Sequence, residues 1–122
     1  MTTLRVARPA LALAAALMLA SLVGCSASGS DFVGAWGKST PGQPSLTIKA
    51  DGTFSGNDGC NDMKGKGTIS GDTFTFGPFA STLKACEGVR PWLNLANTAK
   101  VDGDTLTVYK TNGDKIGTLT KQ

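Results

Sequence analysis

The sequence predicts a mainly β fold of short antiparallel strands linked by tight hairpins, with one short helix. The first observation is a set of turn dipeptides between runs rich in strand formers. Such pairs are favoured where a hairpin needs positive φ, so we expect about seven or eight short strands. The dipeptides are Asp51-Gly52, Gly71-Asp72, Asp102-Gly103 and Asn112-Gly113.

Polar and apolar residues alternate in the runs between these turns, as in residues 45–49, 73–76 and 105–109. Alternation with a period of two places the apolar side chains on one face of a strand. Threonine suits the other face, because its branched side chain fits a pleated surface while its hydroxyl meets water. The residues expected to share the buried face are Leu46, Ile48, Phe54, Phe74, Phe76, Leu106 and Val108.

Residues 90–98 break the alternation. Apolar residues recur there at helical spacing, and Pro91 would occupy the first turn, where its missing N–H costs nothing. These residues therefore predict a short amphipathic helix that covers an open side or end of the sheet. Its apolar positions are Val89, Trp92, Leu93 and Ala96.

Residues 1–24 have the features of a secretory signal that is removed from the mature protein. Arg5 and Arg8 precede an apolar stretch of about 14 residues, which is shorter than the ~20 residues that span a bilayer. The end of this stretch, Leu22-Val23-Gly24-Cys25, resembles the lipobox of bacterial lipoproteins. That resemblance implies cleavage before Cys25 and attachment of a diacylglyceryl group to its sulfur.

Residues 25–31 then form the lipidated cysteine and a Ser/Gly-rich flexible tether to a domain over residues 32–122. We expect a protein that is anchored in a membrane through Cys25 and faces the exported side. Two alternatives stay open: a transmembrane helix, and a plain secreted protein in which Cys25 merely lies near the cleavage point.

Removal of the signal also changes the charge balance. It takes away two of the twelve basic residues and leaves ten against nine acidic ones, and the rest of the chain is long enough for one domain. A nucleic-acid partner needs a clustered basic face, which this balance does not supply. We therefore expect no nucleic-acid partner. We also expect a monomer.

The chain has three cysteines. With Cys25 lipidated, Cys60 and Cys86 are the one possible pair, and small exported domains often rely on such a covalent link. The alternative is a free nucleophilic Cys60, which would need a base or a cation such as Lys64 or Lys84 beside it. A Cys60–Cys86 disulfide is the favoured interpretation.

The stretch GNDGCND, residues 56–62, suggests a calcium loop, but no glutamate lies there to complete an EF-hand. The alternative is that its Asx and Gly residues shape a tight corner of the fold. The chain also has no histidine, which removes Ser-His-Asp and Cys-His arrangements and His-ligated metals. We therefore predict no catalytic residue, no metal and no cofactor, and hence no enzyme.

Three aromatic residues, Trp36, Phe79 and Trp92, are candidates to line a pocket for an apolar ligand. The alternative is that they belong to the core, because a small domain needs its largest side chains for burial.

Several fragments of residues 32–122, in this order and spacing, resemble the META domain, or HslJ-like lipoprotein, family. The resemblance implies a small curved antiparallel barrel or half-barrel with one helix against it. It also implies an envelope-associated protein without an agreed reaction. The fragments are Gly34-Ala35-Trp36, residues 51–56 leading into Gly59-Cys60-Asn61, Ser81-Thr82 ahead of Ala85-Cys86, and a strand pair at 104–108 and 115–119.

The leading hypothesis is a non-enzymatic, lipid-anchored envelope protein that binds or stabilises another envelope protein, with a possible link to stress. A second hypothesis is a carrier of a small apolar ligand or lipid inside the barrel. A third is a module like a protease inhibitor that presents a loop between Cys60 and Cys86. That third hypothesis loses its main support if most of the segment is regular strand.

Overall fold

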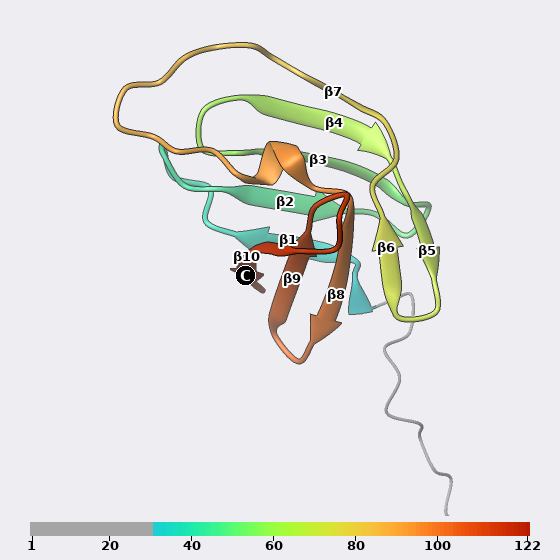
Figure 1. Ribbon diagram of the computed structural model, residues 1–122. Coiled ribbons are helices and arrows are strands. Elements are labelled where there is room, and N and C mark those ends of the chain that lie inside the picture. The colour runs from blue at the N-terminus through green and yellow to red at the C-terminus, as the bar shows by residue number, and fades with distance from the viewer. Residues whose placement is uncertain (1–30) are drawn as a thin grey trace, which may run out of the picture.

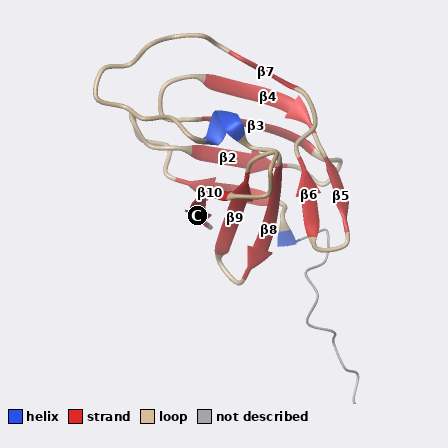
Figure 2. Cartoon of the chain, in the orientation of Figure 1, coloured by secondary structure: helices blue, strands red, loops and turns tan. Residues whose placement is uncertain are grey.

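The computed structural model describes residues 31–122 and arranges them in two antiparallel sheets of five strands each (Figure 1). The mainly β class is confirmed, and the strands of the two sheets cross at a steep angle (Figure 2). The predicted signal peptide, Cys25 and the tether up to residue 30 lie outside the described residues.

The first sheet has the strand order β1-β2-β3-β4-β7, and the second has the order β10-β9-β8-β6-β5. The first sheet consists of β1 (Gly34–Gly37), β2 (Ser45–Ile48), β3 (Thr53–Asn57), β4 (Asp62–Lys66) and β7 (Phe79–Ser81). The second consists of β5 (Thr68–Ser70), β6 (Thr73–Thr75), β8 (Thr98–Asp102), β9 (Thr105–Tyr109) and β10 (Lys115–Thr120).

Each of the four predicted turn dipeptides connects two paired strands. The turns join β2 to β3, β5 to β6, β8 to β9 and β9 to β10. Their glycines all adopt positive φ, which glycine reaches without a steric penalty. The hairpins predicted from the sequence are therefore confirmed.

One long hairpin bends and contributes two strands to each sheet. Its outgoing arm runs from β4 into β5 through Gly67, and its returning arm runs from β6 into β7 through Gly77-Pro78. At the bend the Gly67 N–H leaves the ladder and donates to the Gly52 carbonyl, at 2.8 Å. Each arm is therefore divided into two short strands, which is why there are more strands than expected.

The sheets also approach each other at β1 and the end of β10, where an isolated bridge links Trp36 to Lys121. They do not close into a barrel. The result is a curved sandwich, so of the two expected shapes the half-barrel is closer.

The core lies between the sheets and is centred on five phenylalanines. All seven residues predicted for the buried face are buried. The rings of Phe32, Phe54, Phe74, Phe76 and Phe79 contact one another in tilted or edge-on pairs, with centroids 5.0 to 6.4 Å apart. Such geometries are preferred by aromatic pairs, and full burial of a phenylalanine side chain stabilises a fold by about 1.5 to 3 kcal/mol.

The helix expected over residues 90–98 is shorter than predicted: a single 3-10 turn, η2 (Leu93–Leu95), forms there. Leu93 and Ala96 are buried, and their spacing of three residues lines up on one side of a 3-10 helix. Asn97 then enters the second sheet, since its N–H donates to the Tyr109 carbonyl and its carbonyl accepts from Phe76. Sheet pairing thus ends the helix after one turn.

The turn η2 docks on β10 through Trp92. A Cβ added at Gly117 would lie 2.6 Å from the Trp92 ring, so only a glycine permits this approach. No helix within residues 31–122 combines the length and apolar character needed to cross a membrane.

Candidate functional site

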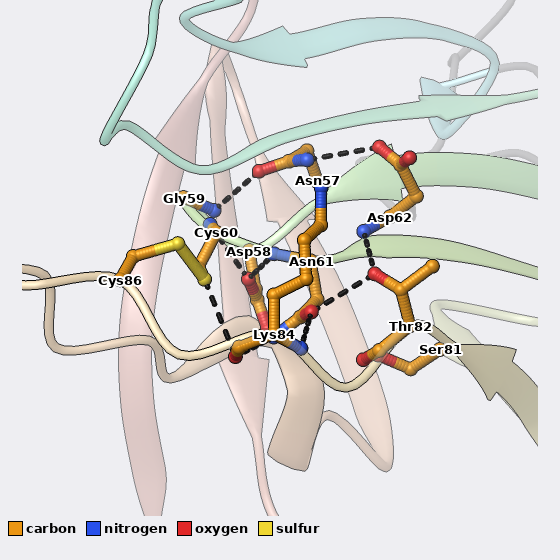
Figure 3. Close-up of a disulfide and its surroundings, with 10 residues drawn as sticks. All are labelled: Asn57, Asp58, Gly59, Cys60, Asn61, Asp62, Ser81, Thr82, Lys84 and Cys86. Carbon is orange, nitrogen blue, oxygen red and sulfur yellow. Dashed lines mark hydrogen bonds between the residues drawn. A yellow bond between two sulfur atoms is a disulfide. The ribbon is translucent and has the colours of Figure 1, made fainter.

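The connection between β3 and β4, residues 57–62, forms a corner that we call the Asn61 corner. Cys60 in this corner is bonded to Cys86, with the Cα atoms 5.8 Å apart (Figure 3). The predicted disulfide is therefore present. Because a disulfide-bonded Cys60 has no thiolate, the alternative of a free nucleophile is wrong.

Asp58 organises the corner from inside, since its side chain is only 2% exposed. Its Oδ1 accepts hydrogen bonds from the backbone N–H groups of Cys60 and Asn61, at 2.9 and 2.6 Å. Its own N–H donates to the Asn61 carbonyl, at 3.0 Å. The other carboxylate oxygen, Oδ2, is buried without a hydrogen-bond partner among residues 31–122. Asp58 thereby sets the position of Asn61.

Asn57 and Gly59 complete the turn. The Asn57 Oδ1 accepts from the Gly59 N–H at 2.7 Å, and its Nδ2 donates to the Asp62 Oδ1 at 2.9 Å. Gly59 has φ of +105°, and a Cβ there would lie 3.1 Å from the Gly42 carbonyl oxygen. Another residue at position 59 would therefore be strained and would crowd the neighbouring loop.

The nearly buried side chain of Asn61 reaches the chain beyond β7 and holds it in two places. Its Oδ1 accepts from the Thr82 hydroxyl at 2.9 Å and from the Lys84 N–H at 2.5 Å. Its Nδ2 donates to the Lys84 carbonyl at 3.1 Å. One amide side chain thus fixes the residues on both sides of Leu83 (Figure 3).

Two further bonds extend the β4 and β7 pairing by one residue. The Thr82 N–H donates to the Asp62 carbonyl at 3.1 Å, and the Asp62 N–H donates to the Thr82 hydroxyl at 3.0 Å. On the other side, the Cys60 Sγ lies 3.5 Å from the Lys84 carbonyl oxygen. Because a disulfide sulfur carries no proton, we regard this approach as a contact.

Residues 82–85, which we call the Leu83 loop, are exposed, although hydrogen bonds hold the backbone of Thr82 and Lys84. The Leu83 side chain is 95% exposed, the largest exposure of a large apolar side chain among residues 31–122. No hydrogen bond to the backbone of Leu83 is found in this part of the chain. The segment that follows β7 runs along the periphery of the molecule in Figure 1. The loop therefore presents an apolar side chain from a fixed backbone.

The polar side chains of GNDGCND serve the fold. One side-chain oxygen of each of Asn57, Asp58, Asn61 and Asp62 accepts a hydrogen bond from the protein. Within residues 31–122, no group of three His, Cys, Asp or Glu residues is arranged to hold a metal ion. The geometry thus favours a structural corner over a calcium loop.

The three aromatic candidates belong to the core or pack against it. Trp36 is fully buried; its indole N–H donates to the Phe32 carbonyl at 2.9 Å, and its ring lies 4.7 Å from the Lys121 Nζ. Phe79 and Trp92 are partly buried and pack against the core. A contact with a ligand stays a prediction for all three.

Sequence reasoning placed the disulfide but missed the role of Asn61, which it interpreted only as part of the corner. It also missed the exposure of Leu83. The available signal was the run Ser81-Thr82-Leu83-Lys84, in which one large apolar residue stands between polar ones just before a cysteine.

A hollow of about 630 Å³ lies on the exposed face of β2, β3 and β4, where its lining includes Thr47, Ser55 and Lys64. A second, of about 350 Å³, lies beside the disulfide and is lined by residues 39–43 among others. Neither is lined by Trp36, Phe79 or Trp92.

The comparisons with known proteins agree with the resemblance in the sequence. The family model that describes the META domain matches residues 26–122. No curated protein and no solved structure matches the chain. Since the matched segment covers well over half of the sequence, the chain belongs to the META domain family.

Proposed function

We propose that this protein is a lipid-anchored, non-enzymatic member of the META family that binds or stabilises another protein of the bacterial envelope. The observation that carries the proposal is the Leu83 loop, where a large apolar side chain is exposed on a backbone fixed by Asn61. Exposure of an apolar side chain is unfavourable in water, and a fixed conformation lowers the entropy lost on binding. A partner that covers Leu83 would therefore gain free energy from burying the apolar side chain and would lose little entropy in fixing the loop.

Two further features support a place in the envelope. The Cys60–Cys86 disulfide suits an oxidising compartment, and Leu22-Val23-Gly24-Cys25 resembles a lipobox. A diacylglyceryl group on Cys25 would give two acyl chains, which hold a protein at a membrane far more stably than one. A stress-related role remains part of the proposal, on the basis of the family alone.

The carrier hypothesis has less support. The inner faces of the two sheets pack phenylalanine rings against one another, and the hollows described above lie on the surface with polar groups in their walls. An apolar ligand prefers an enclosed, mostly apolar cavity.

The proposal is tested by site-specific crosslinking in intact envelopes. A photoreactive amino acid replaces Leu83 in the full chain, and a matched variant carries it at Leu95, which is 55% exposed but lies in η2. We expect a discrete crosslinked protein from position 83 and none from position 95. Equal crosslinking at both positions, or none at either, would contradict the proposal.

The anchor is tested separately. Mass spectrometry of the mature protein should show an N-terminal Cys25 that carries a diacylglyceryl group, and Cys25→Ser should release the protein from the membrane fraction. An unmodified N-terminus at another residue would rule out the lipoprotein assignment. Turnover of an ester, glycoside or peptide substrate by the purified protein would contradict the non-enzymatic part.

A further inference from the structure

We propose that the Leu83 loop is a substrate-like inhibitory loop whose partner is a serine endopeptidase with an apolar specificity pocket. Leu83 would enter that pocket, and the bond between Leu83 and Lys84 would lie across the catalytic serine. This inference rests on the proposed function, because it names the class of partner that the protein binds.

The first step of the argument is the exposure of Leu83. An endopeptidase accepts a side chain that stands clear of its own protein and a backbone that is extended and available for hydrogen bonding. Leu83 is 95% exposed, no residue of the loop has positive φ, and the Leu83 N–H and carbonyl form no hydrogen bond within residues 31–122. Leu83 thus offers an exposed side chain and unpaired backbone groups of the kind that such an enzyme contacts in a substrate.

The second step is the support on both sides of Leu83. Thr82 is held by Asn61 and Asp62, Lys84 is held by both polar groups of the Asn61 amide, and Cys86 is bonded to Cys60. An ordinary surface loop would lose conformational entropy when an enzyme bound it. Here most of that ordering is present before binding, which favours tight association.

The third step concerns the fate of the Leu83–Lys84 bond. Attack by the catalytic serine Oγ on the Leu83 carbonyl carbon expels the Lys84 nitrogen, which takes the serine's proton by way of the catalytic histidine. Asn61 and the disulfide keep that new amine beside the acyl group. The amine can therefore attack the ester, re-form the peptide bond and return the proton to the serine, before water releases Leu83 as a carboxylate.

The rest of the segment between Cys60 and Cys86 plays no part in this contact. Most of it is regular strand, formed by β4, β5, β6 and β7. The hypothesis of one large presented loop is therefore wrong in that form, and the inference is confined to residues 82–85.

The test measures inhibition of three peptidases by the full chain. The protein is produced in bacteria that export it to their envelope and is purified in a non-ionic detergent. The probes are chymotrypsin and subtilisin, which accept apolar side chains, and trypsin, which accepts basic ones. We expect competitive inhibition of at least one of the first two, with the Leu83–Lys84 bond largely intact by mass spectrometry after hours of incubation.

Substitutions then locate the contact. Leu83→Ala should weaken inhibition at least about 30-fold, as expected for the central residue of an interface, and Leu95→Ala should leave it unchanged. Leu83→Lys should transfer inhibition to trypsin. Both positions are exposed, so these variants should fold normally, which circular dichroism and the melting temperature would check.

Asn61→Ala tests whether the Asn61 side chain supports the Leu83 loop. It should turn the inhibitor into a substrate that is cut between Leu83 and Lys84 at least ten times faster than the wild type. If this variant does not fold, the inference is judged from the Leu83 variants alone. The inference is overturned if the wild type inhibits neither chymotrypsin nor subtilisin, is cut as fast as an unstructured peptide, or keeps its specificity in Leu83→Lys.

The outcomes also separate this inference from the proposed function. Crosslinking from position 83 to a protein that is no peptidase, without inhibition of any probe, overturns the inference and leaves the proposed function standing. Failure of both the crosslinking and the inhibition overturns the two together.

Discussion

The meander β8-β9-β10 and the Asn61 corner are built in opposite ways. The meander consists of neighbouring strands with tight glycine turns, and its ladders run in near-continuous register between consecutive strands. The corner instead depends on contacts between distant parts of the chain. Asn61 bonds to residues 21 and 23 positions away, and the disulfide spans 26 positions.

The difference determines how each region is stabilised. In the meander, Ala99, Leu106, Val108 and Leu119 are buried side by side, so the stabilising free energy is spread over many apolar contacts. In the corner a few polar atoms and one covalent bond hold an exposed loop. We therefore expect core substitutions to unfold the whole domain, and corner substitutions to affect the Leu83 loop first.

The largest effect is expected from Phe74→Ala, because the Phe74 ring contacts Phe32, Phe54 and Phe76 at the centre of the core. Its removal should cost about 3 to 5 kcal/mol of unfolding free energy. Urea denaturation followed by circular dichroism measures the loss. Thr118→Ala on the exposed face of β10 is the control and should change stability by less than about 0.5 kcal/mol. Equal effects in the two variants would refute a core-based account of the sandwich.

Loss of the disulfide should have the next largest effect. Cys60→Ala with Cys86→Ala frees a loop of sequence separation 26, which costs about 3.5 kcal/mol in the chain-entropy model. Reductant should lower the melting temperature of the wild type and leave that of the double variant unchanged. A wild-type protein with the same melting temperature in reductant would show that the bond contributes little.

A smaller effect is expected at Asp58. Asp58→Ala leaves the N–H groups of Cys60 and Asn61 without their acceptor and should cost about 1 to 3 kcal/mol. Asp58→Asn should lower the unfolding free energy by less, because it keeps one acceptor oxygen and changes only the unpaired Oδ2 into an amide nitrogen. Denaturant unfolding ranks the two variants.

Hydrogen exchange at the loop provides the second measurement for Asp58. In the wild type the Lys84 amide should exchange slowly despite its exposed side chain, whereas the Leu83 amide should exchange fast. Asp58→Ala should accelerate exchange at Lys84. Unchanged exchange would mean that Asp58 does not position Asn61.

The smallest effect is expected at Asp51, in the turn between β2 and β3. Hydrogen bonds from the Thr53 hydroxyl and the Thr53 N–H, at 2.6 and 2.9 Å, lower the pKa of this carboxyl below its ordinary value of 3.8. A lowered folded-state pKa stabilises the fold above pH 3.8, and this contribution is lost as the pH falls through the folded-state value.

Melting temperatures of the wild type and Asp51→Ala should therefore differ slightly near neutral pH, and the difference should shrink below the ordinary pKa of the carboxyl. A difference that stays constant or grows on acidification would contradict the assigned bonds. Because Asp51 is fully exposed, solvent screens its interactions and keeps the effect small.

How far the sequence predicts the molecule depends on the range of the interactions. The alternation in residues 45–49, 73–76 and 105–109 and the glycines of the four turns are local features, so the strands, the hairpins and the inward-facing residues followed from them. The disulfide partner followed from the small number of cysteines. The division of the strands into two sheets did not, because nothing in the sequence distinguishes Gly67, where the outgoing arm bends, from Gly65 within β4.

The sequence by itself determined the mainly β class, the hairpins, much of the buried face and the Cys60–Cys86 pair, since these depend on backbone preference and on which residues avoid water. The tertiary structure alone decided that residues 93–95 form a single turn, because Asn97 is paired with the second sheet. It also decided that Asn61 supports the Leu83 loop. A hydrogen bond between residues more than twenty positions apart exists only once the fold has brought its donor and acceptor within reach.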